Sequence, residues 1–397
     1  MNVITLKPGK EKSLLRRHPW VYASGIDGTS GRCEPGATVT IRAADGRFLA
    51  RGAYSPESQI RARVWTFDEN EPVDHALIKR RVAAALAHRR QWVRDTDAVR
   101  LVFGESDRLP GLIVDYYGSG ERGQLVCQFN SAGVEQWKTA IVQALVKETG
   151  CPNVYERSDA AVREREGLPL VTGVLAGAEP DPELSVTEHG VRYYVDVRNG
   201  HKTGFYVDQR DNRKLVGDLA QGREVLNCFC YTGGFSLAAL RGGASAVTSI
   251  DSSGEALRIA ANNVRLNGFD EARATWLDAD VFKMLREFRA QGRQFDLIVL
   301  DPPKFAPSAQ HIDRAARAYK EINLVGMQLL QPGGLLFTYS CSGAIGMELF
   351  HKIVAGAATD ARADARILRR LSAGTDHPMS AAFPEGEYLK GLLLEKI

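Results

Sequence analysis

Acidic and sulfur-bearing residues stand directly after strand-like segments in the C-terminal half of the sequence. Asp251, Asp280, Asp301 and Cys341 each follow such a segment. If these segments are parallel strands, their carboxyl ends share one edge of a sheet, where open α/β sheets bind their ligands. Carboxylates accept hydrogen bonds from sugars and bases, and a thiolate attacks carbon. The pattern therefore predicts a nucleotide-like cofactor and a nucleophile at one sheet edge.

A glycine pair marks the turn between a short apolar segment and a helical pattern that begins at Phe235. An acid roughly 20 residues beyond such a turn is where a Rossmann-like sheet holds a ribose diol, and Asp251 stands there. The alternative is a plain turn. A helix with capping-box spacing from Ser252 to Glu255 follows. The residues of this loop predicted to contact the cofactor are Asn227, Phe229, Tyr231, Thr232 and Gly233.

Acids at successive strand ends match S-adenosylmethionine. Asp251 would bind the ribose hydroxyls, Asp280 the adenine amino group, and the glycine loop the methionine part. Asp280 alone could equally be the N-cap of a helix. No Gly-x-Gly-x-x-Gly follows the first strand of this part, which disfavours a nicotinamide-dependent dehydrogenase.

The segment Asp301-Pro302-Pro303-Lys304 follows a fully apolar strand. Two prolines fix the backbone, hold the carboxylate of Asp301 and expose carbonyls toward an entering planar base. This kind of motif also serves enzymes that methylate exocyclic amines, so it indicates base methylation without naming the atom. Lys304 would either lower the pKa of a nearby thiol or hold a phosphate.

Cys341 lies between two serines just after the next strand. A buried cysteine is usually a small apolar filler, but flanking serines at a strand end favour a nucleophile. Carbon 5 of cytosine becomes nucleophilic only after a thiolate adds at carbon 6. In that chemistry Asp301 would hydrogen-bond at N3, and loss of the carbon 5 proton would expel the cysteine.

These residues need a sheet to bring them together. From Val186 onward strands alternate with helices, as in a largely parallel sheet, and the last two strands stand close together as a hairpin. We predict an α/β, Rossmann-like, doubly wound sheet of the class I methyltransferase type. Its seven strands are expected at Glu224–Asn227, Ala246–Asp251, Ala274–Asp280, Phe295–Asp301, Gly334–Tyr339, Ala365–Leu371 and Tyr388–Glu395.

Short β-like segments and turns in residues 1–73 predict a small β-barrel-like domain. Residues 74–185 are interpreted as a middle α+β domain that starts with a helix after Asp74, and residues 186–397 as the sheet domain. The arginines of that helix, Arg80, Arg81, Arg89 and Arg90, are expected to keep it soluble. The acids in Glu105–Gly111 are interpreted as turn residues of a hairpin connection.

Charge is uneven along the chain. The net charge of the 397 residues is only +3, but residues 1 to 65 hold eleven Lys and Arg against five Asp and Glu. Such a basic end indicates a polyanionic partner. A phosphate-contacting patch with an aromatic ring beside it is predicted at Lys10, Lys12, Arg16, Arg17 and Trp20, with a solvated charged face as the alternative.

The composition argues against several other classes. No apolar segment approaches the roughly 18 to 20 residues that cross a bilayer, and no signal-peptide pattern follows the first charges, so we expect a cytoplasmic protein without membrane contact. The six cysteines are scattered, and none forms a Cys-x-x-Cys pair. We therefore expect neither a metal site nor a disulfide framework.

The sequence resembles the bacterial 23S ribosomal RNA large-subunit methyltransferase I family, which makes 5-methylcytosine. The resemblance covers nearly the whole chain and is carried by long strings. These are Gly9–Trp20, Lys202–Arg210, Leu226–Phe235, Asp301–Phe305, Ser340–Gly343, His377-Pro378 and Pro384–Gly386.

The resemblance implies an N-terminal PUA RNA-binding domain, a middle α+β domain and a C-terminal methyltransferase domain. It implies Cys341 as nucleophile and places Gln209 and Arg210 beside the cofactor. Many RNA cytosine-5 methyltransferases carry a second cysteine that helps product release; here that position is Pro303, so the base for the release step stays unassigned.

The sequence therefore predicts an S-adenosylmethionine-dependent cytosine-5 methyltransferase whose partner is 23S ribosomal RNA, free or in an assembly intermediate. One alternative is an exocyclic amino-methyltransferase acting on guanine or adenine. Another is a ribosome-assembly factor that binds RNA without catalysis. A homodimer is an open alternative to a monomer.

Overall fold

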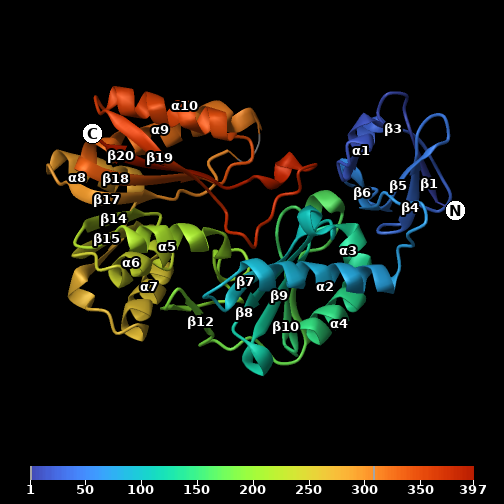
Figure 1. Cartoon of the computed structure of the whole chain (residues 1–397), viewed down its shortest axis with the longest axis horizontal. Coiled ribbons are helices and arrows are strands. Elements are labelled where there is room, and N and C mark those ends of the chain that lie inside the picture. Colours follow the sequence, from blue (N-terminus) through green and yellow to red (C-terminus); the bar gives the residue numbers. More distant parts are fainter. Residues whose placement is uncertain (1, 307–308) are drawn as a thin grey trace. The chain divides into compact units, whose positions relative to one another are not determined.

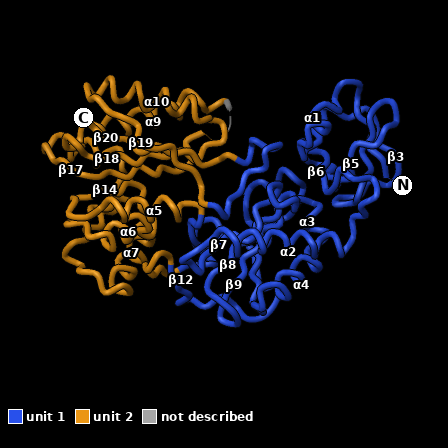
Figure 2. The backbone as a smooth tube through the Cα atoms, in the orientation of Figure 1, with its two compact units in different colours: residues 1–187, 195–207, 375–386 blue, residues 188–194, 208–374, 387–397 orange. Residues whose placement is uncertain are grey.

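The computed structural model of the chain describes residues 2–306 and 309–397, which form two compact units (Figures 1 and 2). Unit 1 comprises residues 1–187, 195–207 and 375–386, and unit 2 comprises residues 188–194, 208–374 and 387–397. The chain therefore passes from one unit to the other five times. Neither unit is a single continuous stretch of sequence.

The N-terminal part of unit 1 is a six-stranded sheet in the order β2-β6-β5-β4-β1-β3. Its core includes the side chains of Ile4, Val39 and Ile41, which are fully buried. The β-like segments predicted in this part of the sequence, Thr38–Arg42, Phe48–Tyr54 and Ile60–Trp65, are strands in the structure, which adds three more that the sequence pattern missed. The elements are β1 (Val3–Leu6), α1 (Lys12–Leu15), β2 (Trp20–Tyr22), β3 (Ile26–Ser30), β4 (Thr38–Arg42), β5 (Phe48–Tyr54) and β6 (Ile60–Thr66).

A second sheet of unit 1 has the order β11-β10-β9-β8-β7, in which only β9 and β10 run parallel. The predicted helix after Asp74 is present, and the carboxylate of Asp74 accepts from the N–H of Leu77 at 2.8 Å. The elements are α2 (His75–Trp92), β7 (Ala98–Phe103), β8 (Leu112–Tyr117), β9 (Gln124–Phe129), α3 (Ala132–Gln136), α4 (Lys138–Thr149), β10 (Val154–Ser158) and β11 (Val171–Ala176). A separate two-stranded sheet follows, formed by β12 (Ser185–Glu188) and β13 (Val191–Tyr194), and β13 belongs to unit 2.

The expectation that the arginines of α2 only keep the helix soluble is wrong for two of the four. Arg81 and Arg89 are buried, whereas the other two are exposed. Arg81 donates to the carbonyls of Trp65 and Arg108, and burial lowers its pKa to about 10. Arg89 donates to the carboxylate of Asp107 at 2.6 Å. These arginines face inward because the adjoining loops offer oxygen acceptors, which a helical pattern does not reveal.

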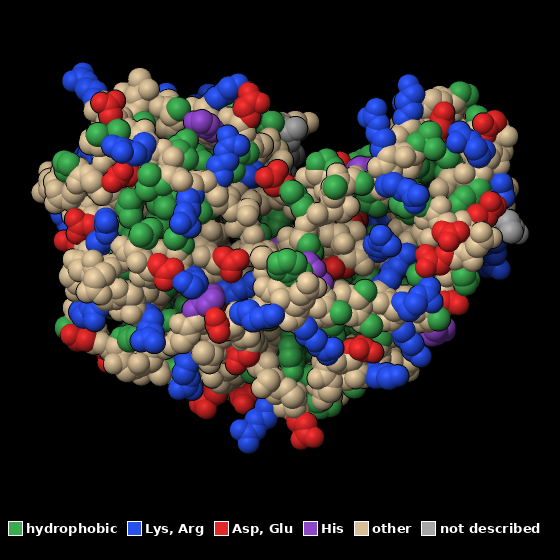
Figure 3. Space-filling model, viewed as in Figure 1, with side chains coloured by type: hydrophobic (Ala, Val, Ile, Leu, Met, Phe, Trp, Pro, Cys, Tyr) green, Lys and Arg blue, Asp and Glu red, His purple; other side chains and the backbone are tan. Residues whose placement is uncertain are grey.

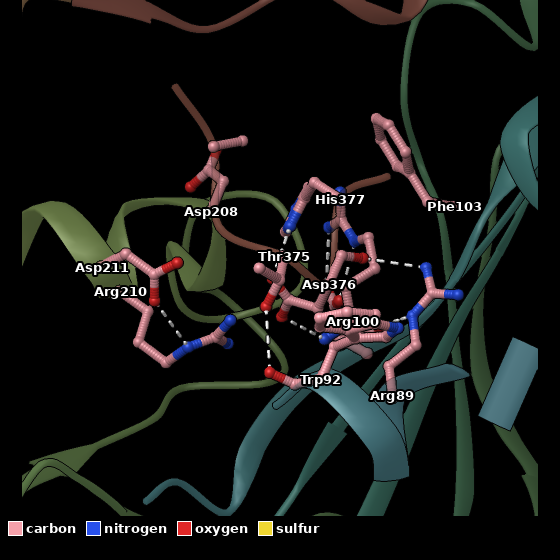
Figure 4. A network of polar contacts seen from close by, with 12 residues as sticks. Arg89, Trp92, Arg100, Phe103, Asp208, Arg210, Asp211, Thr375, Asp376 and His377 are labelled. Carbon is pink, nitrogen blue, oxygen red and sulfur yellow. Dashed lines mark hydrogen bonds and ion pairs between the residues drawn. The ribbon is translucent and has the colours of Figure 1, made fainter. Parts of the chain in front are cut away.

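Residues 375–386 lie between two strands of unit 2 in the sequence but belong to unit 1, and we call them the strap. Figure 4 shows the start of the strap beside α2 and β7. Arg89 donates to the backbone carbonyl of Asp376 at 2.8 Å, and the backbone N–H of Arg100 donates to the carboxylate of Asp376 at 3.0 Å. The ring of His377 lies 5.1 Å from that of Phe103. The strap is therefore held by charged and aromatic contacts of unit 1.

Unit 2 is a seven-stranded sheet in the order β16-β15-β14-β17-β18-β20-β19. The first five strands run parallel, and β20 is antiparallel to both of its neighbours. All seven predicted strands and the final hairpin are confirmed. The elements are α5 (Arg210–Asp218), β14 (Glu224–Cys228), α6 (Gly234–Arg241), β15 (Ala246–Asp251), α7 (Gly254–Leu266), β16 (Ala274–Asp278), α8 (Val281–Ala290), β17 (Phe295–Leu300), α9 (Ile312–Leu329), β18 (Leu330–Ser340), α10 (Met347–Asp360), β19 (Ala365–Ser372) and β20 (Lys390–Lys396).

Several element boundaries in unit 2 differ from the prediction by one to four residues, and two of these differences involve helix caps. The N-cap of α7 is Ser253, whose hydroxyl accepts from the N–H of Ala256 at 3.2 Å, so the capping-box spacing from Ser252 is wrong by one residue. Strand β16 ends at Asp278 rather than Asp280, because Asp280 caps the following helix. Within the described part of the chain, no helix is long and apolar enough to cross a membrane.

Candidate functional site

The carboxyl ends of the five parallel strands of unit 2 face one edge of the sheet. The central strand β14 lies between β15 and β17, so the strand order reverses at this point. Open α/β sheets bind ligands in the crevice formed at such a reversal. The topology thus brings the glycine loop, Asp251, Asp301 and Cys341 to the same edge, as the sequence predicted.

The loop after β14 has an unusual backbone. Phe229, Tyr231 and Gly233 have φ angles of 60°, 49° and 81°, a left-handed conformation that bulky residues rarely adopt. Such strain is typical of functional sites, where the surrounding structure imposes it. A Cβ atom on Gly233 would lie 2.9 Å from the ring of Trp276, so both conformation and space require glycine.

Asp251 ties this loop to the next one. Its two carboxylate oxygens accept from the N–H groups of Tyr231 at 2.8 Å and Ser253 at 2.9 Å. A carboxylate has about four acceptor positions, so two remain for the hydroxyls of a ribose. Asp278, opposite Asp251 in the sheet, is also at this edge, and it is not among the predicted site residues because the predicted strand continues to Asp280.

Asp280 is exposed, and its carboxylate accepts from the N–H of Lys283 at 2.8 Å as the N-cap of α8. The sequence left open whether Asp280 caps a helix, and in the structure it does. A cap uses one carboxylate oxygen, so a contact with an adenine amino group stays a prediction.

Asn227 fits the requirement for a cofactor contact. Its side chain is fully buried at the end of β14, and its amide N–H donates to the hydroxyl of Ser236 at 2.8 Å. Its amide oxygen has no hydrogen-bond partner among the residues that the structure describes. A buried acceptor without a partner costs free energy, which a donor group of a bound ligand would offset. Thr232 is also buried, and its carbonyl accepts from Asn263 at 3.2 Å.

Asp301 is held by the start of α5. The side chain of Gln209 donates to its carboxylate at 3.0 Å and accepts from Asn212 at 2.6 Å. Arg210 is also buried, with its guanidinium 3.4 Å from the carboxylate of Asp211. The structure therefore brings Gln209 to Asp301, and it adds Asn212, a single polar residue inside a helix that no pattern in the sequence marked.

Cys341 is half-buried, while Ser340 and Ser342 on either side are fully buried. The Cys341 thiol lies 3.9 Å from the carbonyl of Pro302, which joins this strand end to the Asp301 motif. Both serine hydroxyls hydrogen-bond to the hydroxyl of Tyr319, at 3.0 and 3.1 Å. The serines thus fix the loop and leave the thiol between them at the sheet edge.

Aromatic rings line the neighbouring loops. Phe229 lies 6.4 Å from Phe282 and 6.3 Å from Phe305 between ring centres, and Phe305 lies 4.8 Å from Tyr319. Ring surfaces of this kind suit a planar base. Phe282 is not among the predicted site residues, because an aromatic residue within an amphipathic helix is usually part of the core, whereas Tyr319 is fully buried in the core beneath Phe305. Lys304 is exposed beside Phe305.

The predicted basic patch lies on unit 1. Lys10, Lys12, Arg16 and Arg17 are all exposed, and Figure 3 shows Lys and Arg side chains gathered over α1 and the N-terminal sheet. Trp20 is half-buried; its indole N–H donates to Glu105 at 2.7 Å, and its ring lies 4.7 Å from Phe383 of the strap. Trp20 is therefore held within unit 1, and a role in RNA binding stays a prediction.

The chain matches two family models. One describes an S-adenosylmethionine-dependent methyltransferase and covers residues 159–382, and the other describes a PUA-like domain and covers residues 4–67. The chain is also 50% identical over 392 residues to the ribosomal RNA large subunit methyltransferase I of Shewanella amazonensis, and 51% identical over 393 residues to that of Aeromonas salmonicida. Each alignment covers 98% of both chains.

Solved structures share the fold. A Streptococcus mutans protein assigned as an S-adenosylmethionine-dependent methyltransferase matches over the full length of both chains, with a TM-score of 0.85 and 22% identity. A second structure, of a protein assigned as a methyltransferase in complex with S-adenosylhomocysteine, gives a TM-score of 0.86 at 22% identity over the same coverage.

Proposed function

This chain belongs to the ribosomal RNA large subunit methyltransferase I family, and from that premise we propose that it methylates carbon 5 of a cytosine in 23S ribosomal RNA. The activity of the family as a whole is S-adenosylmethionine-dependent methylation of large-subunit ribosomal RNA. We further propose three domains, at residues 1–73, 74–185 and 186–397, and a cytoplasmic location.

The cofactor would be held at the edge of the sheet of unit 2. The left-handed loop, the buried amide oxygen of Asn227 and the remaining acceptor positions of Asp251 support this assignment. S-adenosylmethionine supplies the methyl group when it is bound. The residues proposed to contact it are Gln209, Arg210, Asn227, Phe229, Tyr231, Thr232, Gly233, Asp251, Asp280 and Asp301.

The proposed reaction begins at Cys341. Its thiolate sulfur forms a bond to carbon 6 of the cytosine, which makes carbon 5 nucleophilic. Asp301, oriented by Gln209, acts in its protonated form and donates to N3, where negative charge builds up. Once carbon 5 carries the methyl group, a base takes the proton from carbon 5, the electrons of that C–H bond restore the ring double bond, and the bond between sulfur and carbon 6 breaks to release the thiolate.

The position of the Cys341 thiol carries this proposal. A thiol that only filled the core would be buried among aliphatic side chains, but Cys341 is half-buried and 3.9 Å from the carbonyl of Pro302. The carboxylate of Asp301 precedes that proline. A nucleophile and a carboxylate at adjoining strand ends are what addition to a pyrimidine requires.

The test uses a 23S ribosomal RNA fragment that contains 5-fluorocytidine. Because fluorine cannot leave as a proton does, the enzyme should stay covalently attached to this RNA in a denaturing gel. Cys341→Ala should abolish both the adduct and the formation of 5-methylcytidine, measured by mass spectrometry of digested RNA, while S-adenosylhomocysteine affinity stays nearly unchanged. Cys33→Ala, which changes a half-buried thiol of unit 1, is the control and should keep full activity.

Methylation of an exocyclic amine by the Cys341→Ala variant would favour the amino-methyltransferase and refute this assignment. RNA binding without any cofactor binding in equilibrium dialysis would instead favour a non-catalytic assembly factor.

We also assign RNA binding to the exposed cations around α1. Removing one cation that neutralises a phosphate should reduce the slope of log affinity against log salt by about 0.7 to 0.9. Arg16→Ala combined with Arg17→Ala should therefore flatten that slope by up to about 1.8, measured by filter binding. Arg32→Ala is the matched control, because Arg32 is 90% exposed but paired with Glu34 at 2.6 Å. Equal slopes for both variants would contradict the assignment.

A further inference from the structure

Lys390 is a buried cation at the first position of β20. Its side chain is only 1% exposed, although lysine is almost never fully buried without a partner. The register of β18 and β20 sets Lys390 directly opposite Ser340, the residue before Cys341. Its ammonium group donates to the carbonyl of Ser342, the residue after Cys341, at 2.9 Å. The sheet therefore places the cation beneath the loop that carries the thiol.

Charged groups around this ammonium have opposing effects on its pKa. Burial lowers the pKa of Lys390, while Glu387 and Cys341 raise it and Lys304 lowers it further. The interaction between two titrating groups is mutual, so a cation that gains from a thiolate also stabilises that thiolate. Glu387 and Lys304 are both exposed, and solvent weakens their effect at the buried ammonium.

The other titratable groups near Cys341 do not replace Lys390. Burial raises the pKa of Tyr319, which therefore stays neutral at pH 7 and hydrogen-bonds to the two flanking serines. Asp301 lies at the adjoining strand end and is an acid, so it supplies no positive charge to a thiolate. Lys304 is a second cation that acts on Lys390, and it is exposed.

A purely structural role explains the position of Lys390 poorly. Removing an ammonium from water costs free energy that a single carbonyl contact offsets only in part. A neutral donor could pin the Ser342 carbonyl without this cost. Two groups raise the pKa of Lys390, first Glu387, which is exposed, and then Cys341, whose thiol gains from a cation only when it is ionised.

We propose that the Lys390 ammonium holds Cys341 as a thiolate before RNA binds, the proton of the thiol having passed to solvent. The proposal rests on the function proposed above. It makes Lys390 a positioning residue that prepares the nucleophile without touching the base.

The test measures the reactivity of Cys341 in the full chain without RNA. Iodoacetamide alkylation is followed at the Cys341 peptide by mass spectrometry between pH 5.5 and 10. In the unchanged protein the alkylation rate should reach half of its high-pH limit at a pH below about 8.5, the ordinary pKa of a cysteine thiol, and we call this pH the midpoint. Lys390→Met should move it upward by about one pH unit, which is about 10-fold slower alkylation at pH 7, with the same limiting rate at high pH.

Two further variants separate charge from structure. Lys390→Arg keeps a cation and should restore the midpoint, whereas Lys304→Met removes the exposed cation and should shift it less than Lys390→Met. A midpoint at or above about 8.5 in the unchanged protein would overturn the proposal even if Lys390→Met did not fold. An equal midpoint in Lys390→Met would also overturn it. Alkylation needs no methyl transfer, so a missing adduct with fluorinated RNA would refute the proposed function separately.

Discussion

Replacing Gly233 by alanine tests whether the left-handed loop is needed to bind the cofactor. The residue has φ 81° and ψ 22°, and a side chain in this conformation costs about 1 to 2 kcal/mol. An added Cβ would also lie 2.9 Å from Trp276 and 3.1 Å from the Cβ of Ala260. Overpacking of this kind costs about 1 to 3 kcal/mol. Gly233→Ala should therefore lower the unfolding free energy by about 2 to 5 kcal/mol in total.

Gly268 offers a matched control in the same unit. Its φ is 65°, and a Cβ there would meet nothing within 4 Å. Gly268→Ala therefore carries only the backbone cost of about 1 to 2 kcal/mol. The difference between the two variants isolates the crowding against Trp276 and Ala260.

The assays are urea unfolding and calorimetric titration with S-adenosylhomocysteine. Gly233→Ala should unfold at a lower urea concentration than Gly268→Ala and bind at least about 10-fold more weakly, because the loop must shift to relieve the contact. Gly268→Ala should bind like the unchanged protein. Equal stability and equal affinity in both variants would show that the loop conformation does not form the cofactor site.

Three further outcomes are expected. Asp280→Asn should leave α8 stable because asparagine also caps helices, whereas Asp280→Ala should cost about 1 kcal/mol in urea unfolding; a loss of cofactor affinity in Asp280→Asn alone would separate adenine binding from capping. Arg213 donates to the buried carboxylate of Glu188 at 2.7 Å, so Arg213→Met should lower the unfolding free energy by about 3 to 5 kcal/mol because it leaves that carboxylate without its cation. The double variant Arg213→Met with Glu188→Leu should regain most of the lost unfolding free energy, and no regain would contradict the reasoning. Burial raises the pKa of the Cys228 thiol, so the neutral thiol stabilises the fold fully below about pH 8.5, and this stabilisation falls by up to about 1.4 kcal/mol per pH unit above that pH. Cys228→Ala should therefore make the unfolding free energy fall less steeply at alkaline pH, and an unchanged slope would contradict this reasoning.

The strand pattern of unit 2 was predictable because parallel strands covered on both faces are nearly continuous apolar segments. Phe295–Leu300 shows this clearly, since Asp296 is its one polar residue. Ends of elements were less certain, since a short polar residue can close a strand or cap a helix. Asp278 closes strand β16, and Asp280, two residues later, caps helix α8.

The candidate site was predictable only where chemistry follows a strand end. Asp251, Asp301 and Cys341 carry that signal, and the structure brings them to one edge. Lys390 and Asn212 reach the site through register and helix phase, which depend on the whole fold. A lysine at the start of a strand resembles an ordinary exposed end until pairing shows what it faces.

The interleaving of the two units limits how the protein can be dissected. Each is assembled from three separated stretches of chain, so no single truncation yields either intact. Expressing an isolated N-terminal or C-terminal half would remove the strap from unit 1 or leave it without the surface that holds it. RNA recognition and methyl transfer are therefore better separated by point substitutions in the full-length protein than by shortened fragments.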